Sequence, residues 1–385
     1  MHVSCLAKRW PHHTASGGYD RLARETGATV FRRAEGSAFL PRALKRFWLR
    51  MAEPKVHLID YRYEDFLAEW SLLARSWVRK PDVAHVLYGD EQLDLLLRWR
   101  RLLPSPLVAS FHLPTVRVAD RFERSQKHLV AGIDAAVVVS RCQLNDFQSW
   151  LGPDKVVYVP HGVDTQAFCP GNIEPQSSHL RLVMVGHHMR DWEASHRIID
   201  ECRVRNLPVQ FKIVLRERLW PVFTGCTNVH LQAEISEEEL IRLYREADAL
   251  LIPVTDSTAN NAVLEALACG TPVITNSVGG MPDYIDDNCG WLFHKGEVFG
   301  ILELLEQLSN NPEIARSRRK NARLKSLEFS WDRVARQMSA IYNAVADGYP
   351  PVAAVASVEQ NVRVALATPT NMSHRASVVS HLPEL

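Results

Sequence analysis

Short apolar runs alternate with amphipathic stretches along most of the chain, and this pattern occurs twice. In the first half, strands are expected at Val3–Ala7, Val56–Ile59, Val83–Leu87, Leu107–Phe111, Ala135–Val139 and Val156–Val159. In the second half, strands are expected at Leu180–Val185, Phe211–Leu215, Ala249–Ile252 and Pro272–Thr275. Apolar runs that alternate with helical segments are typical of parallel βαβ units, so the pattern predicts an α/β protein.

Polar connections divide this alternation into parts. Pro160–Asp164 and the stretch from Pro170 to Ser178 indicate an interdomain linker. A final helix is expected from Ser330 to about Asp347. We therefore predict an N-terminal domain over residues 1–165, a C-terminal domain over 178–330, a helix over 331–347 that crosses back to the first domain, and a flexible tail over 348–385.

Helix ends are marked most clearly in the second half. Asn260 or Asn261 suits an N-cap, because its side-chain oxygen accepts a free backbone N–H of the first turn. Gly270 suits the left-handed residue that follows a helix end. These signals predict a short helix over residues 262–268. Ser236, followed by three glutamates, predicts a second capped helix.

Glu265 lies inside this otherwise apolar short helix. A buried carboxylate is costly unless it has a partner. Asn261 lies four residues earlier and shares its helix face. The free N–H groups at the helix start suit an anion, so a phosphate there and a hydroxyl at Glu265 would lie on one side of the helix. The alternative is a core helix in which Glu265 pairs with an arginine.

Composition limits the class of protein. The 385 residues are 46% hydrophobic and 23% charged, which is ordinary for a globular protein. No apolar run is long enough to span a bilayer, and no cleavable leader is evident. The seven cysteines form no C-x-x-C pair, which favours free thiols in a reducing compartment and a cytoplasmic location.

Charge is distributed unevenly along the chain. Residues 1–160 carry 24 Lys and Arg against 17 Asp and Glu, whereas the remainder carries 21 against 27. The basic first half suits an anionic surface or acceptor. Residues 40–51 predict a basic amphipathic helix, which either lies on an anionic inner membrane face or packs on the first sheet. No basic run is interleaved with aromatic residues, so nucleic-acid binding is not expected.

Six motifs in order resemble those of family 4 glycosyltransferases of the group 1 type. They are Ser16-Gly-Gly-Tyr-Asp-Arg21, Ser110-Phe-His-Leu-Pro114, Val159-Pro-His-Gly-Val-Asp164, Val185-Gly186, Ser257 to Ile274 and Gly279-Gly-Met-Pro-Asp283. The resemblance implies the GT-B fold, in which two Rossmann-like βαβ domains face each other across a cleft. It also implies a retaining enzyme that moves a sugar from a nucleotide-diphosphate donor to a glycan, lipid-linked or polysaccharide acceptor.

The resemblance also implies site residues. Glu265 would accept hydrogen bonds from the ribose hydroxyls, and Arg190 would neutralise the leaving diphosphate. His112 would lie near the transferred sugar. The residues expected to bind the donor are Gly17, Gly18, Gly186, His187, Ser257, Asn260, Asn261 and Glu265, and those expected to be catalytic are His112, Arg190 and Glu265.

The chain departs from the family pattern at two positions. The first of two glutamates that lie eight residues apart is replaced by Ser257, and His187 stands where an arginine is usual. The adjacent His187 and His188 do not suit one metal, and no Asp-x-Asp motif is present, so no metal or cofactor is expected. A non-catalytic nucleotide-sugar-binding protein and, less favoured, a nucleotide-sugar epimerase are the alternatives.

Overall fold

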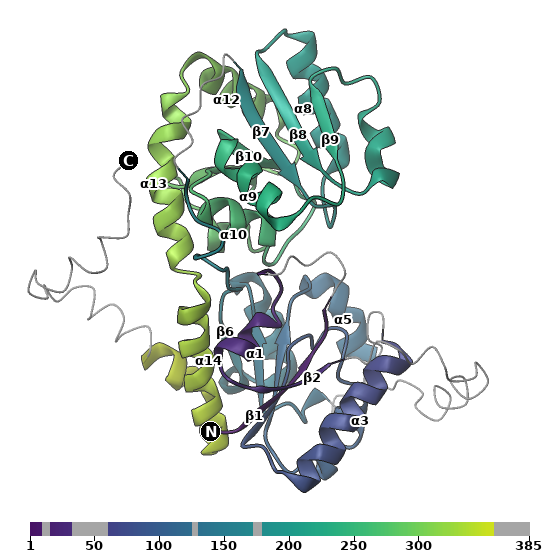
Figure 1. The fold of residues 1–385 in the computed structure, drawn as a ribbon. Coiled ribbons are helices and arrows are strands. Elements are labelled where there is room, and N and C mark those ends of the chain that lie inside the picture. The colour runs from purple at the N-terminus through teal and green to yellow at the C-terminus, as the bar shows by residue number, and fades with distance from the viewer. Residues whose placement is uncertain (10–15, 33–60, 125–129, 172–178, 358–385) are drawn as a thin grey trace, which may run out of the picture.

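The computed structural model describes residues 1–9, 16–32, 61–124, 130–171 and 179–357. These residues form two parallel six-stranded sheets, one in each half of the chain, with helices on both faces (Figure 1). The first sheet has the order β2-β1-β3-β4-β5-β6. Its strands are β1 (Val3–Ala7), β2 (Thr29–Arg32), β3 (Val83–Val86), β4 (Leu107–Phe111), β5 (Ala135–Val138) and β6 (Val156–Tyr158).

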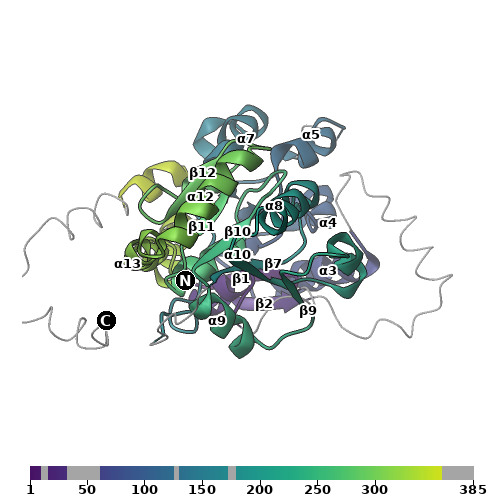
Figure 2. The ribbon, with the colours of Figure 1, turned by 90° about the horizontal axis from the view of Figure 1, so that it is seen from above.

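The second sheet repeats this architecture in the order β12-β11-β10-β7-β8-β9. Its strands are β7 (Leu180–Val185), β8 (Val209–Val214), β9 (Val229–Gln232), β10 (Ala249–Ile252), β11 (Val273–Asn276) and β12 (Gly290–Phe293). Seen from above, the second half covers the first (Figure 2).

Helices cover both faces of each sheet, and those that precede β12 connect successive strands. In the first half they are α1 (Arg21–Glu25), α3 (Tyr63–Val78), α4 (Asp94–Arg98), α5 (Thr115–Arg124) and α7 (Leu144–Leu151). In the second half they are α8 (Trp192–Val204), α9 (Glu237–Glu246), α10 (Asn261–Ala268), α11 (Met281–Tyr284), α12 (Val298–Asn310), α13 (Glu313–Leu327) and α14 (Trp331–Ala346). Short 3-10 helices are η2 (Arg100–Leu102), η3 (Arg141–Gln143), η4 (Pro153–Lys155) and η5 (Glu217–Phe223).

The predicted α/β class is confirmed, and the predicted strands in the described ranges form with small shifts at their ends. The strands that the pattern missed in these ranges include β2, β9 and β12, which lie at sheet edges. Their residues are mostly half-buried or exposed, so they lack the continuous apolar run of a strand that is buried on both faces. The strand expected at Val56–Ile59 and the amphipathic segment 40–51 lie outside the described residues.

The last helix returns to the first half of the chain. Figure 1 shows α13 beside the second sheet and α14 continuing beside the first. Trp331, Met338 and Tyr342 of α14 are buried in one cluster with residues of β1, β3 and α1. Residues 351–357 are helical and Val355 joins the same cluster, so regular structure extends into the segment expected to be a flexible tail. The burial of apolar surface on the first half explains this difference.

The structure also bears on membrane insertion and on the cysteines. Among the described helices, none combines the length and the apolar character needed to cross a bilayer. All seven cysteines are free, as their spacing predicts.

Candidate functional site

Helix α10 has the ends that the sequence predicts. Asn260 is the N-cap, and its side-chain oxygen accepts the N–H of Ala262 at 3.1 Å. Gly270, with a φ of +77°, follows the helix in the left-handed region that glycine tolerates. The helix packs against α9, α13 and β11, so its apolar residues are buried and its position is fixed.

A small pocket lies where the two halves of the chain meet. Its walls come from the loop after β1, from the connection after β6 and from α10. The lining residues are Ser16, Gly17, Gly18, His161, Gly162, Val163, Asp164, Phe168, Asn261, Leu264 and Glu265. Four of the predicted site residues, Gly17, Gly18, Asn261 and Glu265, are therefore brought together, although the two glycines are more than 240 positions from the two residues of α10 in the sequence.

Glu265 is 7% exposed and has a tyrosine as its partner. The hydroxyl of Tyr244 donates a hydrogen bond to Oε2 of Glu265 at 3.0 Å. Burial raises the pKa of Glu265 to about 8, the hydrogen bond from Tyr244 lowers it, and the charge of Glu237 raises it. The partner of Glu265 is thus the neutral hydroxyl of Tyr244 and not an arginine. Among the hydrogen bonds of the described residues, none uses Oε1, so this oxygen is the one available to the pocket.

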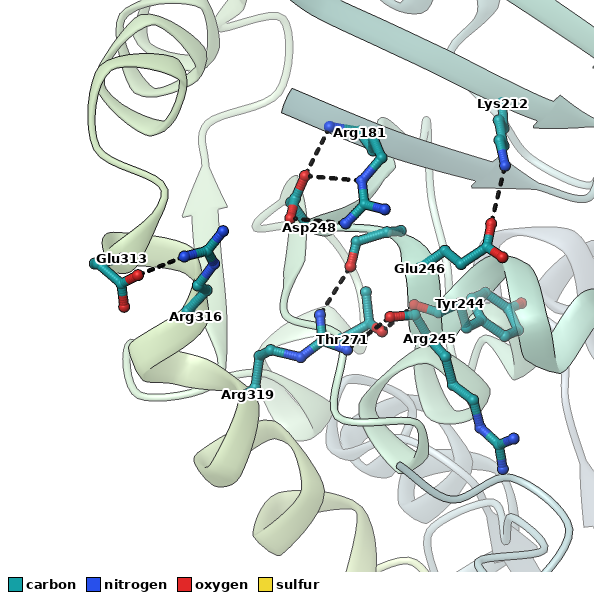
Figure 3. A network of polar contacts seen from close by, with 11 residues as sticks. Arg181, Lys212, Tyr244, Arg245, Glu246, Asp248, Thr271, Glu313, Arg316 and Arg319 are labelled. Atoms are coloured by element: carbon teal, nitrogen blue, oxygen red, sulfur yellow. Dashed lines mark hydrogen bonds and ion pairs between the residues drawn. The ribbon is translucent and has the colours of Figure 1, made fainter. Parts of the chain in front are cut away.

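Tyr244 is held from behind by a network of polar contacts at the carboxyl end of α9 (Figure 3). Thr271 donates its hydroxyl to the carbonyl of Tyr244 at 2.6 Å. Arg319 of α13 donates to the carbonyls of Arg245 and Ala247 at 2.9 and 2.8 Å. These donors satisfy carbonyl groups that a helix end leaves unpaired, and they fix the tyrosine that fixes Glu265.

The glycine loop after β1 makes a direct contact with the second half. Ser16 donates its backbone N–H to Oε2 of Glu237 at 2.8 Å and its hydroxyl to Oε1 at 2.7 Å. Gly18 has a φ of +97°, a conformation that suits glycine and lets the backbone turn at the pocket wall. Arg21 follows in α1 and forms an ion pair with Asp164, which also lines the pocket.

His112 lies beside the pocket and not in its lining. Its Nε2 donates to the carbonyl of Leu87 at 2.8 Å, which leaves Nδ1 as the other ring nitrogen. Its ring centroid is 6.1 Å from that of His161, which does line the pocket. Burial, with a smaller contribution from His112, lowers the pKa of His161 to about 3, so this ring is neutral at physiological pH. The hydroxyl of Thr258 donates to the carbonyl of His112 and joins the two halves here.

The loop after β7 contains the other predicted cation. Arg190 donates from Nη2 to the carbonyl of Val185 at 2.7 Å and from Nη1 to that of His188 at 2.8 Å. Burial lowers its pKa to about 10, so the guanidinium stays charged. Gly186 has a φ of +80°, and a Cβ there would lie 3.1 Å from Nη2 of Arg190. The guanidinium therefore holds its own loop, and neither it, Gly186 nor the neighbouring His187 is among the pocket-lining residues.

Ser257 is also outside the lining. Its N–H donates to the side chain of Asp256 at 2.7 Å, and its carbonyl accepts the N–H of Gly280 at 2.8 Å. A Cβ at Gly279 or Gly280 would clash with carbonyl oxygens of residues 257 and 258. The glycine pair is thus required by close packing of two loops, and Asp256 caps its own loop.

Sequence reasoning missed Tyr244, His161 and Glu237 as members of this site. His161 lies in one of the six motifs, but the resemblance assigns no role to its side chain. Tyr244 carried no signal of its own, because a tyrosine in an amphipathic helix is usually a core residue. Among the described residues, no group of three His, Cys, Asp or Glu side chains is arranged to hold a metal ion.

Two family models match the chain, one in each half. The model for glycosyl transferases group 1 matches residues 225–325, and the model for glycosyltransferase family 4 matches residues 28–167. The chain belongs to the family 4 glycosyltransferases. Together, the two matches include Gly279 and Gly280, helix α10 and the connection after β6 that forms one wall of the pocket.

Three relatives are similar to this chain over part of their own length. The MMP alpha-(1->4)-mannosyltransferase of Mycolicibacterium hassiacum is 26% identical over 68% of this chain and 64% of its own. A GDP-mannose-dependent alpha-(1-6)-phosphatidylinositol dimannoside mannosyltransferase of Mycobacterium tuberculosis is 27% identical over 70% of both chains. The sulfoquinovosyl transferase SQD2 of Arabidopsis thaliana is 30% identical over 66% of this chain, which spans 54% of that relative.

Solved structures match most of this chain in fold. Sucrose-phosphate synthase from Thermosynechococcus elongatus matches with a TM-score of 0.67 at 16% identity, over 89% of this chain and 98% of its own. Anabaena HepE in complex with UDP-glucose matches with a TM-score of 0.65 at 14% identity, over 88% and 98%. The predicted GT-B fold is thereby confirmed.

Proposed function

We propose that this family 4 member is a retaining glycosyltransferase that moves a sugar from a nucleotide-diphosphate donor to a glycan, lipid-linked or polysaccharide acceptor. The observation that carries the proposal is the pocket in which Glu265 and Asn261 face the backbone of Gly17 and Gly18. A carboxylate oxygen that is not used within the protein suits ribose hydroxyls. The relatives named as mannosyltransferases, one of them GDP-mannose-dependent, support a nucleotide-sugar donor.

In this proposal each wall of the pocket has its own part in donor binding. Glu265 accepts the ribose hydroxyls from Oε1 while Tyr244 holds Oε2. The start of α10 and the glycine loop present backbone N–H groups to the diphosphate. His112, whose ring lies beside that of His161, is placed near the transferred sugar. Arg190 supplies positive charge near the leaving diphosphate while it holds the loop after β7.

The proposed reaction exchanges one bond at the anomeric carbon. The bond from this carbon to the donor phosphate oxygen breaks, and a bond to the acceptor oxygen forms on the same face of the sugar. The acceptor proton passes to the departing phosphate oxygen, which has gained the electron pair. Metal independence, a cytoplasmic location and contact of residues 40–51 with an anionic inner membrane face are further parts of the proposal.

Thermal unfolding with added nucleotide sugars tests the proposal. A ligand that binds only the folded chain must raise its stability, so one of the UDP-, GDP- or ADP-sugars is expected to raise Tm. Release of the matching nucleoside diphosphate in the presence of an acceptor, with EDTA leaving the rate unchanged, is the expected activity. No stabilisation by any of these donors would count against the proposal.

The geometry of the β7 loop favours a second candidate. Both Nη atoms of Arg190 are engaged by carbonyls, and Ser257 stands where a glutamate is usual. A chain with a weakened diphosphate and sugar site would bind the nucleotide sugar without transferring it. Isothermal titration that shows donor binding, together with no transfer and no donor hydrolysis, would identify this non-catalytic role.

A further inference from the structure

One carboxylate reaches from the second half of the chain to the glycine loop of the first. Both oxygens of Glu237 accept hydrogen bonds from Ser16, one from its backbone N–H and one from its hydroxyl. Two donors that converge on a carboxylate form an anion-binding arrangement. The loop after β1 can therefore bind an anion at Ser16, and in this conformation the anion is a side chain of the protein.

The same loop forms a wall of the proposed donor pocket. Ser16 lines that pocket together with Gly17, Gly18 and Glu265. Glu237 is not among the lining residues, but it lies close enough to Glu265 for its charge to raise the pKa of Glu265. A diphosphate that approached this loop would meet the Glu237 carboxylate at its hydrogen-bond donors and would be repelled by its charge.

The side-chain cap of helix α9 comes from a residue other than Glu237. Ser236 caps the helix by accepting the N–H of Glu239 at 3.1 Å. Glu239 forms an ion pair with Arg242 on the same helix at 2.6 Å, and Glu238 is exposed. Within the described chain, the hydrogen bonds that the Glu237 carboxylate accepts all come from Ser16. Of the three glutamates in this turn, Glu237 is the one directed to the loop.

We propose that Glu237 is an internal competitor of the donor diphosphate for the hydrogen-bond donors of Ser16. This inference rests on the proposed function and deepens it. Donor binding displaces the carboxylate from the loop, and departure of the diphosphate product lets it return. The apparent affinity for the diphosphate is then lowered by the fraction of molecules in which Glu237 occupies the loop.

The competition is measured with inorganic diphosphate, an anion that carries neither base nor sugar. Isothermal titration of the full chain compares wild type with Glu237→Gln, which keeps the size of the side chain and removes its charge. We expect the variant to bind diphosphate about tenfold more tightly, because the loop donors are released. The matched control is Glu238→Gln, which removes one charge from the same turn and is expected to bind as wild type does.

A double-mutant cycle with Ser16→Ala separates direct competition from general electrostatics. If Glu237 acts through Ser16, the gain from Glu237→Gln is smaller in the Ser16→Ala background. A gain of equal size in both backgrounds, or an equal gain from Glu238→Gln, would show a field effect and overturn the inference. Glu237→Asp, which is too short to keep both hydrogen bonds, provides a second variant and is expected to show a partial gain.

The remaining outcomes decide the inference without reference to a particular nucleotide sugar. Unchanged or weaker diphosphate binding by folded Glu237→Gln would show that Glu237 is inert or closes the pocket over its ligand. Absence of diphosphate binding in wild type and all variants would also overturn the inference. Failure of every nucleotide sugar to bind, with diphosphate still bound more tightly by Glu237→Gln, would sink the proposed function alone.

Discussion

Glu69 in the first half and Glu265 in the second half are both buried glutamates on helices, and burial raises the pKa of each to about 8. Oε2 of Glu69 accepts the N–H of Leu96 at 2.8 Å, which ties α3 to α4. Tyr61 lies beside this carboxyl group and lowers its pKa. Each glutamate thus has a tyrosine that favours its ionised form.

The two glutamates differ in what they face. Glu69 is fully buried and lies near Asp65 and Asp94, whose charges raise its pKa further. Glu265 lines a pocket beside Asn261, opposite the glycine loop. A raised carboxyl pKa therefore reports burial in both halves, whereas a binding site also needs an oxygen that a ligand can reach.

Exchanging each glutamate for glutamine is the strongest test of this comparison. At pH 9, where Glu265 is ionised, Glu265→Gln is expected to weaken binding of the stabilising nucleotide sugar about a hundredfold, because hydrogen bonds to a charged acceptor become bonds to a neutral one. Glu69→Gln is expected to leave donor binding unchanged, whatever it does to the stability of the first half. Isothermal titration of both folded variants measures the difference.

Equal effects of the two exchanges would contradict the comparison. If both variants lost affinity together, the loss would reflect a change of the whole fold and not of the pocket. If neither lost affinity, the assignment of Glu265 to the ribose would be wrong. Circular dichroism and thermal unfolding of each variant separate these outcomes from misfolding.

The central strands and the site helix could be predicted from the sequence because their signals are local. Strands buried on both faces need continuous apolar runs, and α10 is bounded by Asn260 and Gly270. The edge strands β2, β9 and β12 could not be predicted in this way, since one side of each lacks a neighbouring strand and their exposed positions need no apolar residue; the fourth edge strand, β6, is mostly buried and was predicted.

The part of the site that depends on long-range contacts could not be predicted from the sequence. The bond from Tyr244 to Glu265 and the contact of Ser16 with Glu237 join elements that only the tertiary fold brings together. The engagement of Arg190 by carbonyls of its own loop likewise depends on the backbone course after Gly186. Residue type showed which groups were chemically suitable, and packing decided which of them line the pocket.

Donor binding is expected to depend on pH through Glu265 and not through Glu69. Because the pKa of Glu265 is raised to about 8, the group holds a proton at pH 7 and loses it as the pH rises. Donor affinity is therefore expected to rise about tenfold between pH 7 and pH 9 and to level off above the pKa. Tyr244 faces the same carboxyl group, but burial keeps its pKa well above 10, so it stays neutral over this range.

Two variants assign this pH dependence to one of the glutamates. Isothermal titration at several pH values is expected to show a flat profile in Glu265→Gln and the wild-type profile in Glu69→Gln. A profile that persisted in Glu265→Gln would show that another group titrates and would contradict the assignment to Glu265.

The tyrosine partners give the smallest expected effect. Tyr244→Phe removes the hydrogen bond to Oε2 of Glu265, and the pKa of Glu265 should rise because that bond favours the ionised form. Donor KM is expected to increase about fivefold with little change in kcat, and the midpoint of the pH profile should move upward. Tyr61→Phe is the matched control, because its glutamate lines no part of the pocket. A loss of kcat without a shift of the pH midpoint in Tyr244→Phe would show that the tyrosine acts on the fold and not on Glu265.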